Sequence, residues 1–260
     1  MESIKKATFA AISCVHVPFE NKDAKAWMLD TLSNNPPTHF ILLGDLFDAG
    51  AVSVHPSEFE HALEDEYEKG YKYLKEIMEV LPDSTELIWT HGNHDDNILA
   101  KDPRRSPRGL RSLLSWNKHY EFGELFRTWK QIPYSKSKKG MYKLGQVYFY
   151  HGFDAGANSD DLETLQMAMM AGGHAHRLFI RGHTHRPTMG VVQCKRSLKI
   201  KLPWYYANAG TMGPLNPDYM NRRDSSGWGA AMVVGEAALS EPRRPSTSDW
   251  DANVVQFDGR

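Results

Sequence analysis

The sequence has few cysteines, no long apolar run and almost no net charge. Two cysteines in 260 residues cannot build a disulfide framework, which fits a reducing compartment. No stretch approaches the ~20 apolar residues of a membrane helix. The N-terminal residues show neither a long apolar segment nor a small-residue cleavage site. We therefore expect a cytoplasmic protein without a membrane partner.

Three motif classes are also missing. There is no glycine-rich phosphate loop with its lysine, which argues against phosphoryl transfer from ATP. No Cys₄ or Cys₂His₂ pattern occurs, so a structural zinc finger is excluded. The chain shows no internal repeat, and its formal net charge of −1 points to no partner and no oligomeric state.

The chain does have the composition of a globular protein, with 41% hydrophobic and 24% charged residues. Apolar runs and helical spacing alternate in its first 90 residues, which predicts a parallel α/β layer. We expect strands at 8–13, 39–43, 87–90, 147–150, 178–180, 189–194, 198–206 and 229–234, and helices at 23–32, 58–81 and 160–170. These form one domain over residues 1–240, followed by a C-terminal tail over residues 241–260.

Residues 98–143 interrupt this pattern and are predicted to form a basic helical insertion. They hold twelve Lys and Arg against three acids, a net charge of +9, and seven aromatic residues. Such a segment suits a polyanion with stackable bases. A solvated helical face over a local aromatic core explains the same composition equally well. The candidate phosphate contacts are Arg104, Arg105, Arg108 and Arg111.

Metal-competent side chains follow five of the predicted strands. Ligand-binding groups of parallel α/β sheets lie just past the carboxyl ends of strands, so we expect these side chains to meet. They are Cys14 and His16, Asp45 and Asp48, Asn93 and His94, His151, and His183 and His185. Carboxylate, imidazole and amide donors together suit Mn, Zn or Fe. Two such ions ~3.5–4 Å apart can clamp a phosphate and activate water for attack on it.

The order D-x-H, G-D-x-x-D, G-N-H-D, H and G-H-T-H is the signature of the calcineurin-like metallophosphoesterases, with cysteine in the first position here. The chain resembles this superfamily from about residue 7 to residue 234. It is most similar to the compact phage-type members, which would place it in the host cytoplasm if it is phage-encoded. The resemblance implies an αββα fold, in which two mixed β-sheets are flanked by helices. It also implies hydrolysis of a phosphoester with two divalent metal ions.

The roles of the site residues are carried over from that resemblance. His16, Asp45 and His185 would bind one metal ion. Asp45, Asn93, His151 and His183 would bind the other, with Asp45 as the bridge. His94 would be the general acid or a donor to the phosphate, and the Asp48 carboxylate would hold its ring. Asp95 is expected to support the site rather than react.

Cys14 departs from the family pattern, which has aspartate as a ligand of the first metal. Cys14 can be a thiolate ligand that favours Zn or Fe over Mg or Mn. It can also be too short to reach the metal, which leaves a weakened first site, or it can mark a non-catalytic relative. A strand-end cysteine is, in addition, often a small buried hydrophobe.

The substrate follows less directly from the residues. Ala49-Gly50 after Asp48 departs from the Arg-Gly of the family's protein phosphatases. Asp95 ends the third motif as in family phosphodiesterases and nucleases. We therefore expect a phosphodiesterase or nuclease that acts on nucleic acid or nucleotides. The alternatives are a phosphomonoesterase for a nucleotide or small phosphate, and a non-catalytic nucleic-acid-binding or metal-binding protein.

Overall fold

The computed structural model describes residues 5–50, 62–99, 125, 127–173, 176–192, 203–216, 227–240 and 246–259. Its strands are β1 (Lys6–Ile12), β2 (His39–Leu42), β3 (Glu86–Thr90), β4 (Trp129–Ile132), β5 (Tyr142–Leu144), β6 (Val147–Phe149), β7 (Leu178–Arg181), β8 (Thr188–Val191), β9 (Tyr205–Asn208), β10 (Ala231–Ala238) and β11 (Trp250–Gln256). Its α-helices are α1 (Lys22–Asn34), α2 (Leu63–Val80), α3 (Asn93–Leu99) and α6 (Ser159–Met170), and its 3₁₀ turns are η3 (Lys138–Gly140) and η5 (Thr247–Asp249).

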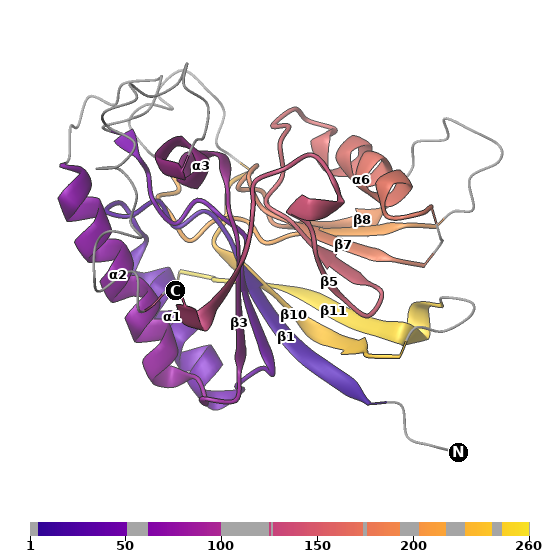
Figure 1. The fold of residues 1–260 in the computed structure, drawn as a ribbon, viewed down its shortest axis with the longest axis horizontal. Coiled ribbons are helices and arrows are strands. Elements are labelled where there is room, and N and C mark those ends of the chain that lie inside the picture. The colour runs from indigo at the N-terminus through magenta and orange to yellow at the C-terminus, as the bar shows by residue number, and fades with distance from the viewer. Residues whose placement is uncertain are drawn as a thin grey trace.

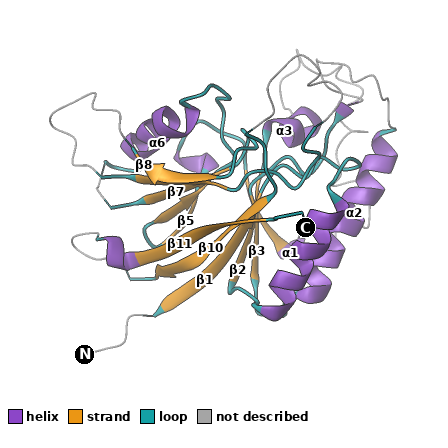
Figure 2. Cartoon of the chain, turned by 180° about the vertical axis from the view of Figure 1, so that it is seen from behind, coloured by secondary structure: helices purple, strands orange, loops and turns teal. Residues whose placement is uncertain are grey.

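The strands form two mixed sheets. The six-stranded sheet has the order β11-β10-β1-β2-β3-β4, in which β1 to β4 are parallel and β10 and β11 are antiparallel additions. The five-stranded sheet has the order β5-β6-β7-β9-β8, with parallel β6, β7 and β9 between antiparallel edges. Helices α1 and α2 lie on one side of the molecule and α6 on the other (Figures 1 and 2). This is the expected αββα sandwich.

Alternation along the strands creates three apolar layers. In β1, Ala10 and Ile12 pack toward α1 and α2, whereas Phe9 and Ala11 pack against the second sheet. Successive strand side chains point to opposite faces, so a strand covered on both faces reads as a continuous apolar run. A third layer, which includes Phe179 of β7, lies under α6. The sequence therefore predicted the buried strands well.

Two expectations about the chain outside these strands were wrong. Residues 250–256 were assigned to a tail, but they form β11, which pairs with β10 over seven residue pairs. Within the predicted helical insertion, residues 129–132 form β4, which extends the first sheet beside β3. Both are edge strands with partly polar sequences, which give little apolar signal. Residues 100–124 of the insertion lie outside the described part of the chain.

Candidate metal centre

The loops after β1, β2, β3, β6 and β7 meet at one edge of the sandwich. The backbone N–H of Cys14 donates to the carbonyl of Gly44 at 3.0 Å, which joins the first two loops. The N–H of His183 donates to the Cys14 sulfur at 3.3 Å, which joins the two sheets. The five strand ends predicted to carry the site thus converge.

One cluster of donor atoms surrounds the ring of His151. Its Nε2 lies 3.0 Å from a carboxylate oxygen of Asp45 and 3.1 Å from the amide oxygen of Asn93. The Nδ1 of His183 lies 3.2 Å from the same nitrogen. These are the four side chains expected to bind the second metal. Their donor atoms converge as binding of one metal ion would require.

A second cluster lies on the other side of Asp45. The Nε2 atoms of His16 and His185 are 3.4 Å apart, and His16 Nε2 is 3.9 Å from the same Asp45 oxygen, Oδ2, that faces His151. The Cys14 sulfur lies within 4.8 Å of the donor atoms of His16 and His185, and also of those of Asp45 and His151. Asp45 therefore stands between the two clusters, where a bridging carboxylate would be needed.

The backbone of this site is unusual. Cys14, His16, Asp45, His183 and His185 all have left-handed φ angles, between 52° and 69°. Non-glycine residues in this region are strained by about 1–3 kcal/mol each and gather at functional sites, where the surrounding structure holds them. Sequence spacing gave no indication of this conformation.

Two glycines allow the loops to approach each other. Gly44 has φ +79°, and a Cβ on it would lie 2.5 Å from the backbone nitrogen of Gly92 and 2.7 Å from His151 Nδ1. A Cβ on Gly92 would overlap the Asp45 carboxylate. Glycine is therefore needed at both strand ends for close approach rather than for flexibility.

The pair expected between Asp48 and His94 differs in the structure. The Nδ1 of His94 lies 2.5 Å from the Asp48 backbone carbonyl. The Asp48 carboxylate lies instead 3.3 Å from Nδ1 of His16. Asp48 therefore contacts the ring of His94 through its main chain, and its side chain contacts a candidate ligand. Residue types alone cannot distinguish these two arrangements.

Burial and neighbouring rings favour the neutral form of two candidate ligands, His183 and His185. Burial, and then the neighbouring ring of His151, lower the pKa of His183 to about 3. Burial, and then His16, lower the pKa of His185 well below its usual value. Burial opposes ionisation of Asp45, but the charges of His151 and His94 outweigh it and lower its pKa. The neutral state of His183 and His185 is the protonation state that metal binding requires, whereas at His151 burial is outweighed by the charge of Asp45, which raises the pKa of that ring.

Asp95 holds the loop that carries Asp45. Its buried carboxylate accepts a hydrogen bond from the Trp89 indole at 3.2 Å. It also accepts four backbone hydrogen bonds at 2.9–3.4 Å, from Asp45, Leu46, Phe47 and Gly92. The geometry agrees with the supporting role expected for Asp95.

Replacing Asp95 with alanine should lower the free energy of unfolding by about 3 kcal/mol, because five buried donors would lose their acceptor. Denaturant unfolding of the metal-free protein measures this loss. The matched control is Asp83→Ala, in the exposed turn before β3. Equal losses in the two variants would contradict the anchoring role of Asp95.

Glu66 of α2 is a supporting residue that sequence reasoning missed. Its carboxylate accepts from the backbone N–H groups of Ala49 and Gly50 at 2.7 and 3.2 Å, so it holds the segment directly after Asp48. Glu66 is buried on the same helix face as Gly70 and Ile77. The helical spacing of Glu66 from these buried residues could have indicated that Glu66 is buried, but Glu66 lies in a run of acidic residues typical of an exposed helix face.

The titration of Glu66 should affect stability. Burial raises its pKa from 4.5 to about 7. The folded chain therefore binds a proton more tightly than the unfolded chain, so stability is lost as pH rises through about 7. Between about pH 5 and about pH 8, the free energy of unfolding of metal-free wild type should fall by on the order of 2 kcal/mol more than that of Glu66→Gln. The exposed neighbour gives the control, because Glu68→Gln should retain the wild-type pH dependence.

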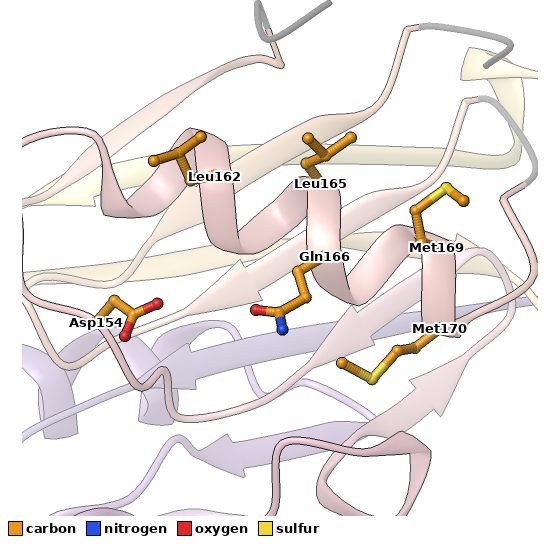
Figure 3. Close-up of a pocket in the computed structure, with 6 residues that line it drawn as sticks. All are labelled: Asp154, Leu162, Leu165, Gln166, Met169 and Met170. Carbon is orange, nitrogen blue, oxygen red and sulfur yellow. The ribbon is translucent and has the colours of Figure 1, made fainter. Parts of the chain in front are cut away.

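A separate hollow of about 520 Å³ lies on α6. Figure 3 shows its lining, which is mostly apolar: Asp154, Leu162, Leu165, Gln166, Met169 and Met170. It shares no residue with the candidate metal centre. None of the described helices is long and apolar enough to cross a membrane.

The fold and the strand-end donors together define a metallophosphoesterase sandwich. Residues 7–187 match the family model described as calcineurin-like phosphoesterase, and the chain belongs to this family of metal-dependent phosphoester hydrolases. The match does not distinguish phage-type members from others. No curated protein matches the chain.

Several solved structures are similar to most of the chain at low identity. Vacuolar protein sorting 29 from Cryptosporidium parvum is 11% identical with a TM-score of 0.48, covering 97% of this chain and 98% of its own. The phosphoesterase Yfce from E. coli is 13% identical with a TM-score of 0.39, covering 90% and 100%. The nuclease MPE from Pseudomonas putida is 14% identical with a TM-score of 0.39, covering 87% and 83%.

Proposed function

We propose that this chain hydrolyses phosphodiesters of nucleic acids or nucleotides with two divalent metal ions, of which Mn, Zn and Fe are the candidates. The first would be held by Cys14, His16, Asp45 and His185, and the second by Asp45, Asn93, His151 and His183. The observation that carries the proposal is the position of one Asp45 oxygen, 3.0 Å from His151 and 3.9 Å from His16. A carboxylate so placed can serve both clusters.

The donor set fits such ions. A donor set of imidazoles, one carboxylate and one amide oxygen suits Mn, Fe or Zn better than it suits Ca or Mg. Bound ions would supply Lewis-acid activation of the phosphoryl group and of the attacking water. The protein's own part is to hold these donors in place and to bind the phosphate between the loops after β2, β3 and β7.

His94 is the proposed proton donor to the leaving oxygen. Its Nδ1 faces the Asp48 carbonyl and therefore carries a hydrogen, which leaves Nε2 to hold the exchangeable proton. Its backbone N–H donates to Asp45 Oδ1 at 2.9 Å, so the ring is fixed beside the bridging carboxylate. Burial favours the neutral ring, but Asp45 and the Asp48 carbonyl outweigh it and raise the pKa of His94.

Aromatic side chains beside both clusters favour a substrate with bases. The ring of Trp228 lies 4.2 Å from that of His185, and the ring of Tyr134 lies 6.0 Å from that of His151. Both side chains are partly exposed, and such rings can stack a base. Arg104, Arg105, Arg108 and Arg111 remain the proposed phosphate contacts, and they lie outside the described residues.

Model esters separate the candidate functions. Purified protein, with its metal content measured, is assayed with each divalent metal on bis-p-nitrophenyl phosphate and on p-nitrophenyl phosphate. Preference for the diester supports the proposal, whereas preference for the monoester makes the protein a phosphomonoesterase. Absence of turnover with every metal, combined with DNA binding, would identify a non-catalytic binding protein.

Cys14 is the proposed sulfur ligand of the first metal. Burial, and then the charge of Asp45, raise the pKa of its thiol well above the usual value, so ligation would have to release a proton. Metal–sulfur bonds of ~2.3 Å partly offset the shorter reach of cysteine compared with aspartate. Ser13 Oγ lies 2.9 Å from the sulfur, a contact that a purely packing role would also allow.

Cobalt substitution should show whether Cys14 ligates. With Co(II) at both sites, we expect a sulfur-to-metal charge-transfer band in the near ultraviolet that disappears in Cys14→Ala. Cys14→Asp should shift the preference toward Mn or Mg, because a carboxylate is a harder ligand. Two bound Co(II) ions without the band, and unchanged binding in Cys14→Ala, would make Cys14 a packing residue.

A further inference from the structure

The loop between His183 and His185 is strained and needs support. Both histidines have left-handed φ angles, 69° and 60°, on either side of Thr184. The N–H of Thr184 donates to the Gly182 carbonyl at 2.9 Å, which closes a tight turn. A turn with two left-handed histidines persists only where neighbouring groups hold it.

Asn208 occupies the position from which this turn can be held. It ends β9, is paired with Arg181 of β7, and is fully buried. Its Nδ2 lies 2.7 Å from the Thr184 hydroxyl and 3.1 Å from the Gly182 carbonyl, both inside the turn. Its Oδ1 accepts from the Gly210 N–H at 3.0 Å, which fixes the orientation of the amide.

The amide of Asn208 is also anchored to α6. Nδ2 lies 3.0 Å from the carboxylate of Asp160, in the first turn of that helix. The same Asp160 oxygen is 3.4 Å from the buried guanidinium of Arg181, which pairs with Glu163 at 2.9 Å. The contact with the turn is thus made from a frame that spans β7, β9 and α6.

We propose that Asn208, through its contacts with Thr184 and Gly182, is a positioning residue that presets His183 and His185 for metal binding. The proposal rests on the proposed role of these histidines as ligands. The Asn208 amide contacts both Thr184, which lies between the two histidines, and Gly182, which precedes them. The spacing of the two histidine rings therefore depends on this amide. Partners behind metal ligands typically contribute 10–100-fold to metal affinity.

Two substitutions remove the contact between the Asn208 amide and the Thr184 hydroxyl, one from each side. Asn208→Leu deletes the amide but keeps the branched shape of the side chain, and Thr184→Val replaces only the hydroxyl with a methyl group. Thr184→Ser keeps the hydroxyl and is the conservative rescue. The matched control is Thr85→Val, which removes the buried hydroxyl that donates to the Pro37 carbonyl at 2.9 Å, at the far end of β3. Circular dichroism of each variant establishes that it is folded.

The measurement is Co(II) and Zn(II) affinity, by competition with a chromophoric chelator. We expect Asn208→Leu and Thr184→Val to weaken binding roughly 10–100-fold. Thr184→Ser and Thr85→Val should bind as wild type does. In the metal-free protein, hydrogen exchange of residues 182–186 should increase in the first two variants only.

The proposal is overturned if folded Thr184→Val keeps the wild-type metal affinity and the wild-type hydrogen exchange of residues 182–186. It is also overturned if Thr184→Ser binds metal as weakly as Thr184→Val. If Asn208→Leu does not fold, the two Thr184 variants still decide. A wild-type chain that binds no metal would contradict the proposed function. The exchange comparison would then decide the role of Asn208 on its own.

Discussion

Replacing Asp45 with asparagine should lower the rate of phosphoester hydrolysis by about 10³-fold or more while the chain stays folded. Asp45 stands between both donor clusters, so its loss should weaken both proposed metal sites together. Lewis-acid activation by metal ions contributes several kcal/mol, and each 1.4 kcal/mol corresponds to a factor of ten. Asparagine can still accept the backbone hydrogen bond from His94, so the loop should keep its conformation.

The measurement is turnover of both model esters with the metal content of each protein determined. Asp83→Asn, in the exposed turn before β3, is the matched control and should keep wild-type turnover. Wild-type turnover of Asp45→Asn at equal metal content would remove Asp45 from the site. Loss of the circular dichroism signal would assign Asp45 a structural role instead.

The second large effect is expected from His94→Ala. If His94 protonates the leaving oxygen, its removal should slow hydrolysis by ~10²–10⁴-fold on esters with poor leaving groups. The loss should be much smaller for p-nitrophenolate, which departs without a proton. The readout is therefore the ratio of the two losses, measured with a p-nitrophenyl ester and an alkyl ester.

His176→Ala is the control for His94, because His176 precedes β7 at the end opposite to His183. It should leave both rates unchanged. Equal losses for good and poor leaving groups in His94→Ala would show that His94 positions the phosphate and does not supply the proton.

The sequence predicted the frame of this protein because apolar runs and their ends are local signals. Residues 39–43 and 178–180 are apolar enough to be buried on both faces, and β2 and β7 lie there. Asp45 and His183 follow these runs, so a parallel sheet brings them to one edge. The family, the αββα fold and the convergence of the candidate ligands were all available at this level.

The tertiary structure alone decided how these side chains are held. Asp95, Glu66 and Asn208 contact Asp45, Ala49 and Thr184, which lie 17 to 50 residues away in the sequence. A buried polar group must find a partner, but residue type does not specify which one. The path of the backbone likewise decides that Asp48 contacts His94 through its carbonyl. It also decides that the candidate ligands have left-handed φ angles. Sequence by itself therefore determined which residues gather at the site, and the packing of the two sheets and α6 determined how each of them is supported.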